Sequence, residues 1–100
     1  ATDQADAEGC TPLFIACYKG HREIARLLRE ADAAVDHAAD NGATPLFAAC
    51  HFGHLEISRL LLEAGAAINQ AKATGTTPLF AACLQGHVEI VRLLLEAGAA

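Results

Sequence analysis

Cysteine and histidine are the residues of this sequence best suited to chemistry, and they recur in pairs separated by three residues. The pairs are Cys17 with His21, Cys50 with His54, and Cys83 with His87. Residues four positions apart on one helix point the same way, and zinc accepts both a thiolate and an imidazole as ligands. The three copies could therefore be parts of a metal site, or they could be a structural feature that repeats with the chain.

Two features of these pairs favour the structural interpretation. Gly53 separates Cys50 from His54 and interrupts the helix that would place them on one face. A closed zinc site needs four ligands around one ion, whereas packed helices lie about 8–10 Å apart, which keeps two pairs from sharing an ion. We expect no metal site, and a metal or redox protein that uses the cysteine–histidine series is kept as a third alternative.

An enzyme is disfavoured on similar grounds. Catalysis needs a nucleophile, a base and an orienting group that converge on one point, but the cysteines and most of the histidines follow the repeat of the chain. A glycine-rich phosphate loop is also missing from the sequence. We therefore expect a protein without catalytic residues and without a bound cofactor.

Composition and charge narrow the classes of function further. The chain has 100 residues, enough for one domain, and 53% of them are hydrophobic. A net charge of −5 leaves no broad basic surface for phosphates, so we expect no nucleic-acid binding. The sequence contains no apolar run of the roughly 18 residues that cross a membrane, so we expect no membrane insertion.

The spacing of the cysteines bears on the cellular compartment. The chain contains Cys10, Cys17, Cys50 and Cys83, and the last three are 33 residues apart. Cysteines at equivalent positions of separate units do not face one another, and Cα atoms more than about 7 Å apart cannot be bridged by a disulfide. We expect free thiols and hence a reducing, intracellular location in the cytoplasm or the nucleus.

The whole chain is organised by a period of 33 residues. Thr-Pro-Leu-Phe begins at positions 11, 44 and 77, and Gly-His follows nine residues later in each copy. A 33-residue period headed by Thr-Pro-Leu resembles the ankyrin repeat, and GHLEISRLLLEAGA resembles the second helix of that family with its terminal glycine. The resemblance implies an all-α solenoid of helix-turn-helix units joined by β-turn or hairpin loops. The units of this single domain (1–100) would span about 6–38, 39–71 and 72–100, the last of them truncated.

The residues of the middle copy support these elements independently of the family resemblance. Thr44 is a suitable N-cap and Pro45 a suitable first residue for a helix over 45–52, which Gly53 would end. A second helix would begin near His54. Its buried stripe, at the spacing of one helix face, would consist of Ile57, Leu60 and Leu61. A single unit of this kind cannot bury its own apolar faces, so the units must stack.

Two positions of the repeat lead to expectations about packing. The family has a histidine after Thr-Pro-Leu, and this chain has a phenylalanine there. We expect a column of stacked rings under the turns, formed by Phe14, Phe47 and Phe80. The resemblance implies burial for the cysteines that match a small core residue of the family's first helix, Cys17, Cys50 and Cys83. Cys10, which lies next to a turn, should be the accessible thiol.

In a repeat protein the shared residues form the scaffold, and the residues that vary are candidates for function. The resemblance places the variable residues at the first helices and turns of the concave side, where the family holds its partners. These candidates are Glu8, Cys10, Tyr18, Lys19, Asp40, Asn41, His51, Phe52, Lys72, Thr74, Thr76, Leu84 and Gln85. Aromatic side chains at the centre with charges at the tips are typical of an interface. The expected function is non-catalytic binding of another protein or peptide.

The alternative function is an assembly unit whose ends stack on other copies or on a longer array. Arg22 and Arg29 stand where the third unit has Val88 and Leu95, so we expect the first unit to be polar on its outer side, as a terminal unit is. The third unit keeps the apolar residues of an internal unit, so its outer side lacks a cap. We expect that the natural chain continues past Ala100, or that this end associates with another molecule.

Overall fold

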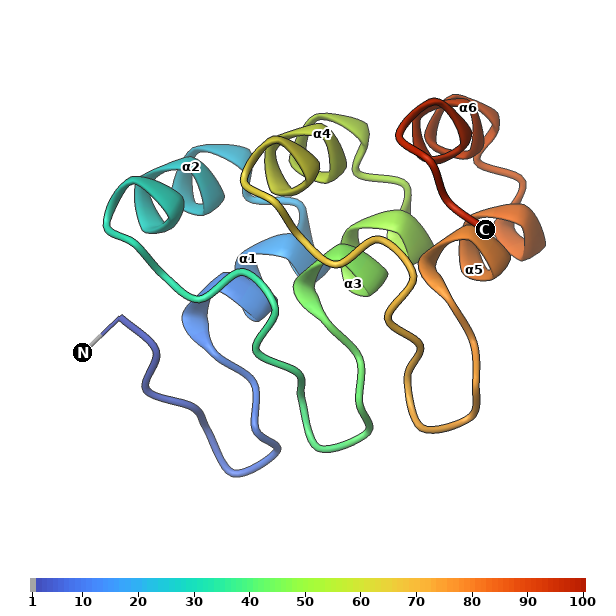
Figure 1. Cartoon of the computed structure of the whole chain (residues 1–100). Helices are drawn as coiled ribbons and strands as arrows, with labels where there is room; N and C mark the ends of the chain where they lie inside the picture. Colours follow the sequence, from blue (N-terminus) through green and yellow to red (C-terminus); the bar gives the residue numbers. More distant parts are fainter. Residues whose placement is uncertain (1) are drawn as a thin grey trace.

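A computed structural model describes residues 2–100, and Figure 1 shows three helix pairs stacked side by side. The first helices of the pairs lie in one layer and the second helices in another, and long loops extend from the first layer. The helices are α1 (Pro12–Lys19), α2 (Arg22–Glu30), α3 (Pro45–Phe52), α4 (Leu55–Glu63), α5 (Pro78–Gln85) and α6 (Val88–Glu96). None of these helices has the length and apolar character needed to cross a membrane. The expected all-α solenoid of helix pairs is confirmed.

The helix boundaries follow from the caps that the repeat supplies. The Thr44 hydroxyl accepts a hydrogen bond from the Phe47 amide (3.1 Å), and Pro45 occupies the first helical position. Gly53 follows the last residue of α3 in a left-handed conformation, with a φ of 81°. The other two first helices have the same pair of caps. The expected first helix over 45–52 is therefore confirmed, and each repeat contains its equivalent.

The apolar core lies between the two layers of helices. Its largest fully buried apolar side chains are Leu13, Leu46, Ile57, Leu61, Ile90 and Leu94. Full burial of such a side chain stabilises the fold by about 1.5–3 kcal/mol before entropy is counted. Of the stripe expected on α4, Ile57 and Leu61 are buried and Leu60 is half-buried at the edge of this core.

The hairpin loops form a row that borders the first helices, and we call them fingers 1, 2 and 3. They comprise residues 6–10, 39–43 and 72–76. In each finger the amide of the first residue donates to the carbonyl of the last, at 2.9–3.0 Å. Finger 2 is joined to finger 1 by a hydrogen bond from the Asp40 amide to the Glu8 carbonyl (3.0 Å). Finger 3 is joined to finger 2 by a hydrogen bond from the Ala73 amide to the Asn41 carbonyl (2.8 Å), so the row is continuous.

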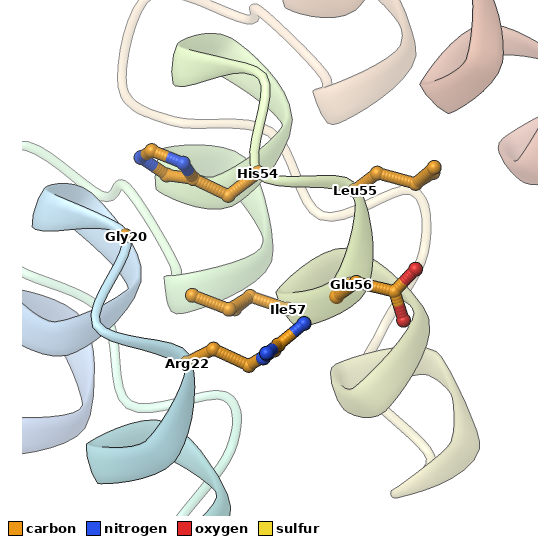
Figure 2. A pocket seen from close by; sticks show the side chains of 6 residues that line it. All are labelled: Gly20, Arg22, His54, Leu55, Glu56 and Ile57. Atoms are coloured by element: carbon orange, nitrogen blue, oxygen red, sulfur yellow. The ribbon is translucent and has the colours of Figure 1, made fainter.

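The repeated histidine links each helix pair to the one before it. The His54 ring donates from Nε2 to the Tyr18 carbonyl (3.2 Å), and His87 donates in the same way to the His51 carbonyl (3.0 Å). Both carbonyls lie in the last turn of a first helix, where carbonyls have no partner within the helix. Figure 2 shows the His54 ring extending towards Gly20 of the preceding repeat. The histidine of the cysteine–histidine pair therefore has a structural role.

Exposure along the repeat shows which neighbour each position faces. Ile24 is 49% exposed, whereas its equivalents in the next two repeats are 2% exposed, so this position faces the preceding repeat. Phe80 is 56% exposed, whereas its equivalents in the first two repeats are 7% and 6% exposed, so this position faces the following repeat. The N-terminal end face consists of Ile15, Ile24 and Leu27. The C-terminal end face consists of Phe80, Cys83, Val88 and Leu95.

The expectation that the first repeat is polar on its outer side is wrong. Arg22 lines an open groove of about 440 Å³ with His54 and Glu56 of the second repeat (Figure 2), and Arg29 lines another with Ala64. Both arginines therefore face the second repeat. The physical reason is that these two positions of the repeat face the following repeat. Val88 and Leu95, at the same positions of the third repeat, are exposed on the C-terminal end face. The outer side of the first repeat exposes the apolar N-terminal end face instead.

The expected column of stacked phenylalanines is also wrong for the described residues. The Phe14 ring lies 6.2 Å from the Tyr18 ring, and the Phe47 ring lies 5.9 Å from the His51 ring, one turn further along the same helix. Each of these two phenylalanine rings is therefore paired within its own helix, and not with the equivalent phenylalanine of the next repeat. Phe80 is exposed because no repeat follows it in the structure.

Candidate functional site

The candidate residues form two rows on the side where the fingers meet the first helices. One row, at the ends of α1, α3 and α5, consists of Tyr18, Lys19, His51, Phe52, Leu84 and Gln85. The other row lies in the fingers and consists of Glu8, Cys10, Asp40, Asn41, Lys72, Thr74 and Thr76. All of these side chains are exposed or half-buried, so a partner could reach both rows.

Rings from the first two repeats form a group that includes part of the first row. The Tyr18 and Phe52 rings have centroids 4.5 Å apart, although they come from different helices. Phe52 also meets His51 edge to face at 4.5 Å. Phe14 and Phe47 extend the group towards the fingers. We call these five residues the aromatic cluster. Tyr18 and Phe52 are 45% and 43% exposed, so the centre of the cluster faces solvent.

Phe14 and Phe47 belong to this site, although sequence reasoning assigned them a purely structural role. Each is buried beneath the hairpins, and each presents its ring to the aromatic or imidazole residue four positions later. That spacing places two side chains on one helix face. The spacing of Phe14 and Tyr18 was therefore a usable signal in the sequence.

Lys72 of finger 3 is the one cation that the described structure places over an aromatic ring. Its Nζ lies 5.0 Å from the centroid of the Phe47 ring. The negative face of the ring attracts a cation within about 6 Å. Lys72 is half-buried in this position, and it closes one end of the aromatic cluster.

Two adjoining hollows run along the aromatic cluster between the fingers. The hollow between fingers 1 and 2, which we call the first hollow, has a volume of about 310 Å³ and is bordered by Glu8, Phe14, Tyr18, Ala39 and Asp40. The hollow between fingers 2 and 3, the second hollow, has about 140 Å³ and contains Phe47, Phe52 and Lys72 in its lining. Both hollows share Phe14, Tyr18 and Asn41. The concave side therefore carries one groove rather than isolated pits.

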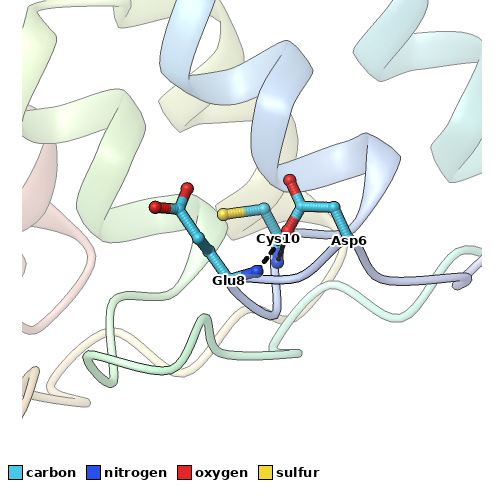
Figure 3. A group of neighbouring side chains, drawn as sticks. All are labelled: Asp6, Glu8 and Cys10. Carbon is cyan, nitrogen blue, oxygen red and sulfur yellow. Dashed lines mark hydrogen bonds between the residues drawn. The ribbon is translucent and has the colours of Figure 1, made fainter.

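Finger 1 is the acidic end of this groove. Figure 3 shows the Asp6 carboxylate accepting hydrogen bonds from the amides of Glu8 and Cys10, both at 2.9 Å. Burial raises the pKa of the Cys10 thiol, and the negative charges of Asp6, Glu8 and Asp40 raise it further. Asp6, Glu8 and Cys10 offer three ligand atoms within 4.8 Å of one another. Because Asp6 is engaged in closing the turn and two of the three residues are exposed, we assign no metal to this group.

Apart from Lys72, the residues predicted in the third repeat do not join this groove. Thr74 and Thr76 hydrogen-bond to each other across the tip of finger 3 (2.9 Å). Leu84 is 67% exposed and, like Gln85, does not line either hollow. Lys19, at the end of α1, lies outside the hollows as well. The site is therefore centred on the first two repeats rather than spread along the whole stack.

The cysteines of the first helices do not supply a reactive group to the site. Burial raises the pKa of Cys17 to about 12 and that of Cys50 to about 11, so both thiols are protonated near neutral pH. The Cys50 thiol also lies 3.6 Å from the Ser58 hydroxyl. The expected burial is confirmed for these two residues and wrong for Cys83, which is exposed on the C-terminal end face.

Charged side chains on the second helices are arranged differently from those of the groove. Arg26 pairs with Glu23 and Glu30, Arg59 with Glu56, and Arg92 with Glu89. All of these ion pairs are exposed and lie within one helix, where solvent and salt screen the attraction and leave it little weight in stability. The outer layer is thus a solvated surface, and the aromatic rings all belong to the layer of first helices.

Comparison with known families agrees with the geometry of the repeat. The family model described as ankyrin repeats (3 copies) matches residues 31–100, and the model for a single ankyrin repeat matches residues 8–40. No curated protein matches the chain. The two family matches together cover residues 8–100, which include all six helices, fingers 2 and 3, and the residues that line both hollows.

Proposed function

The chain belongs to the ankyrin-repeat family, and we propose that it binds another protein or a peptide in the groove along the aromatic cluster. Ankyrin repeats are in general modules for protein–protein interaction, and they are typically non-enzymatic. The observation that supports this groove is the contact between Tyr18 and Phe52. These two rings are nearly half exposed, touch at 4.5 Å and come from adjacent repeats on the concave side.

Physical chemistry favours an interface at these rings. Aromatic side chains expose large areas that lose water on binding, and their few rotatable bonds make them inexpensive to immobilise. Phe52 sits at the centre of the cluster, in contact with both Tyr18 and His51. Residues that carry most of the binding energy are usually large aromatic side chains near the centre of an interface. The surrounding polar fingers would then form the rim.

The proposal also covers the location and the excluded partners. The free cysteines and the acidic composition support a cytoplasmic or nuclear protein that contacts neither nucleic acid nor membranes. The oxidation state of the four thiols in protein isolated from intact cells tests this part of the proposal. A native disulfide in that material would contradict a reducing location.

Peptide selection tests the proposed groove directly. We suggest selecting binders from a randomised dodecapeptide library and measuring their affinity by fluorescence polarisation. Phe52→Ala should weaken binding at least about tenfold, which corresponds to about 1.4 kcal/mol. The melting temperature should change little, because the side chain is 43% exposed.

Leu27→Ala is the matched control for this substitution. Leu27 is a similarly exposed apolar residue, but it lies on the N-terminal end face, away from the groove. Its truncation should leave peptide affinity unchanged. Peptides whose affinity does not depend on Phe52 would contradict the proposed groove, and unfolding of Phe52→Ala would show that this residue belongs to the core.

A second candidate function is end-to-end assembly, and the two end faces favour it. The N-terminal end face is apolar at Ile24 and Leu27, and the C-terminal end face is apolar at Phe80, Val88 and Leu95. Inside the stack, the residues at the positions of the C-terminal end face of one repeat lie against those at the positions of the N-terminal end face of the next. A copy of the chain could therefore extend the stack at either end, with the same packing as an internal junction.

A further inference from the structure

The repeat allows the two hollows of the groove to be compared position by position. In the second hollow, the Phe47 ring is covered by the cation of Lys72, which comes from the next finger. A shift by one repeat, 33 residues towards the N-terminus, takes Phe47 to Phe14 and Lys72 to Ala39. The first hollow therefore contains the same aromatic floor with an alanine where the lysine would be.

The hollow that lacks the lysine is also the larger of the two. The first hollow, bordered by Ala39, has about 310 Å³, whereas the second, which contains Lys72, has about 140 Å³. A long side chain could enter the larger space from solvent and reach the Phe14 ring. Tyr18 stands at its border, so the stem of such a side chain would lie along an aromatic surface.

The negative charges around the first hollow favour a positively charged side chain entering it from outside. Glu8 and Asp40 border it from two adjoining fingers, and no lysine or arginine contributes to its lining. Asp6, in finger 1, is the third carboxylate of this group, and its negative charge contributes to the raised pKa of the neighbouring Cys10 thiol. Each of these carboxylates is at a finger, so the negative charge surrounds the entrance rather than the floor. An entering cation would meet opposite charge at the rim and a ring face below.

We propose that the first hollow receives a lysine or arginine side chain of the protein partner, with its cation above Phe14 and between Glu8 and Asp40. This inference rests on the proposed function, and it adds the chemistry of the partner's anchoring residue. The contact between Lys72 and Phe47 is the internal precedent within the same chain. The partner's side chain replaces the one that Ala39 lacks.

The chemistry of the anchor can be tested on the peptides selected against the unmodified protein. The selected sequences should share one lysine or arginine at a fixed position. Exchange of that residue for a neutral side chain of similar length, norleucine for lysine or citrulline for arginine, should weaken binding by about tenfold or more.

Ala39→Lys tests the position of the anchor on the protein. It restores the lysine of the equivalent position in finger 3 and should fill the first hollow with the protein's own cation. Because Lys72 occupies this position in finger 3 with the same backbone hydrogen bond, the substitution should preserve the fold. Affinity for the selected peptides should fall by about tenfold or more, the same loss that is expected when the basic residue of the peptide is exchanged for a neutral one.

Ala73→Lys is the matched control, because it adds the same charge to an exposed position of finger 3 outside both hollows. It should leave affinity within about twofold, because the added ammonium is in solvent outside both hollows and moderate salt screens it. Peptides that depend on Phe52 but tolerate the neutral exchange, or that bind Ala39→Lys normally, would overturn the basic anchor and leave the groove intact. Peptides that bind independently of Phe52 would overturn the groove as well.

Discussion

The exposure of a side chain in this protein depends on its neighbours in the stack as much as on its own identity. Cys17, Cys50 and Cys83 occupy the same place in three first helices, and each directly follows an alanine. The first two are buried, because the next repeat covers them, and the third is exposed. The same position of the repeat therefore produces two buried thiols and one accessible thiol.

Thiol titration under native conditions should distinguish three kinds of cysteine. Cys83 should react fastest, because it is exposed. Cys10 should react more slowly, because it is half-buried and because burial and its acidic neighbours raise its pKa, which lowers the fraction of thiolate. Cys17 and Cys50 should react only on unfolding, because burial raises their pKa values to about 12 and about 11.

Added salt and single substitutions show which cysteine causes each phase of the thiol titration. Added salt should speed Cys10, since it screens the charges of Asp6, Glu8 and Asp40, and should leave the buried pair unreactive. Cys83→Ser should remove the fastest phase and Cys10→Ser the intermediate one. A Cys83 thiol that reacts only on unfolding would contradict the exposure of the C-terminal end face.

The sequence predicts the role of a residue within its repeat better than the direction in which it points. Threonine caps, prolines and glycines act locally, so the first helix over 45–52 could be predicted from the residues alone. The direction of Arg22 could not, because a helix stripe does not show which side the preceding repeat occupies. The acid-bordered first hollow was missed for a related reason: it depends on the absence of a side chain at Ala39.

The junction between neighbouring helix pairs is the element that converts a repeat into a stack. His87 donates to the His51 carbonyl at the end of α3, and its ring lies against Gly53. A Cβ added to Gly53 would approach the ring within 2.8 Å. Gly86 occupies the same left-handed conformation after α5, but nothing lies within 4 Å of an added Cβ there. Comparison of the two glycines therefore separates the cost of backbone strain from the cost of displacing the histidine ring.

Gly53→Ala should destabilise the protein more than Gly86→Ala. Both substitutions force alanine into a left-handed conformation, at a cost of about 1–2 kcal/mol. Gly53→Ala also displaces His87 and its hydrogen bond, which should cost roughly 1 kcal/mol more. Urea unfolding monitored by circular dichroism measures both free energies of unfolding.

A double-mutant cycle with His87→Ala identifies the origin of the difference. Removal of the imidazole takes away the three atoms nearest to the added methyl group at Gly53, so the extra cost of Gly53→Ala should disappear. His87→Ala should leave the cost of Gly86→Ala unchanged. Equal effects of the two glycine substitutions in the unmodified protein would show that the histidine ring moves aside without cost.

At the scale of the whole molecule, the stack has two different ends rather than one capped and one open end. Ile24 and Leu27 are about half exposed on the N-terminal end face, and Val88 and Leu95 are more than half exposed on the C-terminal end face. Because the two surfaces differ, association through them would be head to tail, and it would not close into a symmetric dimer. A chain that assembles this way forms open arrays whose length depends on concentration.

Blocking one end at a time tests this mode of assembly. Val88→Arg with Leu95→Arg copies the arginines of repeat one, at positions 22 and 29, onto the exposed C-terminal end face. Val91 is unsuitable for this purpose, because it packs against the core. Ile24→Lys with Leu27→Lys blocks the N-terminal end face. Light scattering should show that the mean mass of the unmodified chain rises with concentration, whereas each double variant alone stays monomeric.

A mixture of the two double variants provides the decisive measurement. Each variant retains one intact end face, and in head-to-tail packing these two faces are complementary. The mixture should therefore form a one-to-one complex of two chains that grows no further, because both of its outer ends are blocked. Dimers of the N-terminally blocked variant alone would instead indicate contact between two C-terminal end faces. An unmodified chain that remains monomeric at high concentration would exclude end-to-end assembly and leave the concave groove as the candidate binding surface.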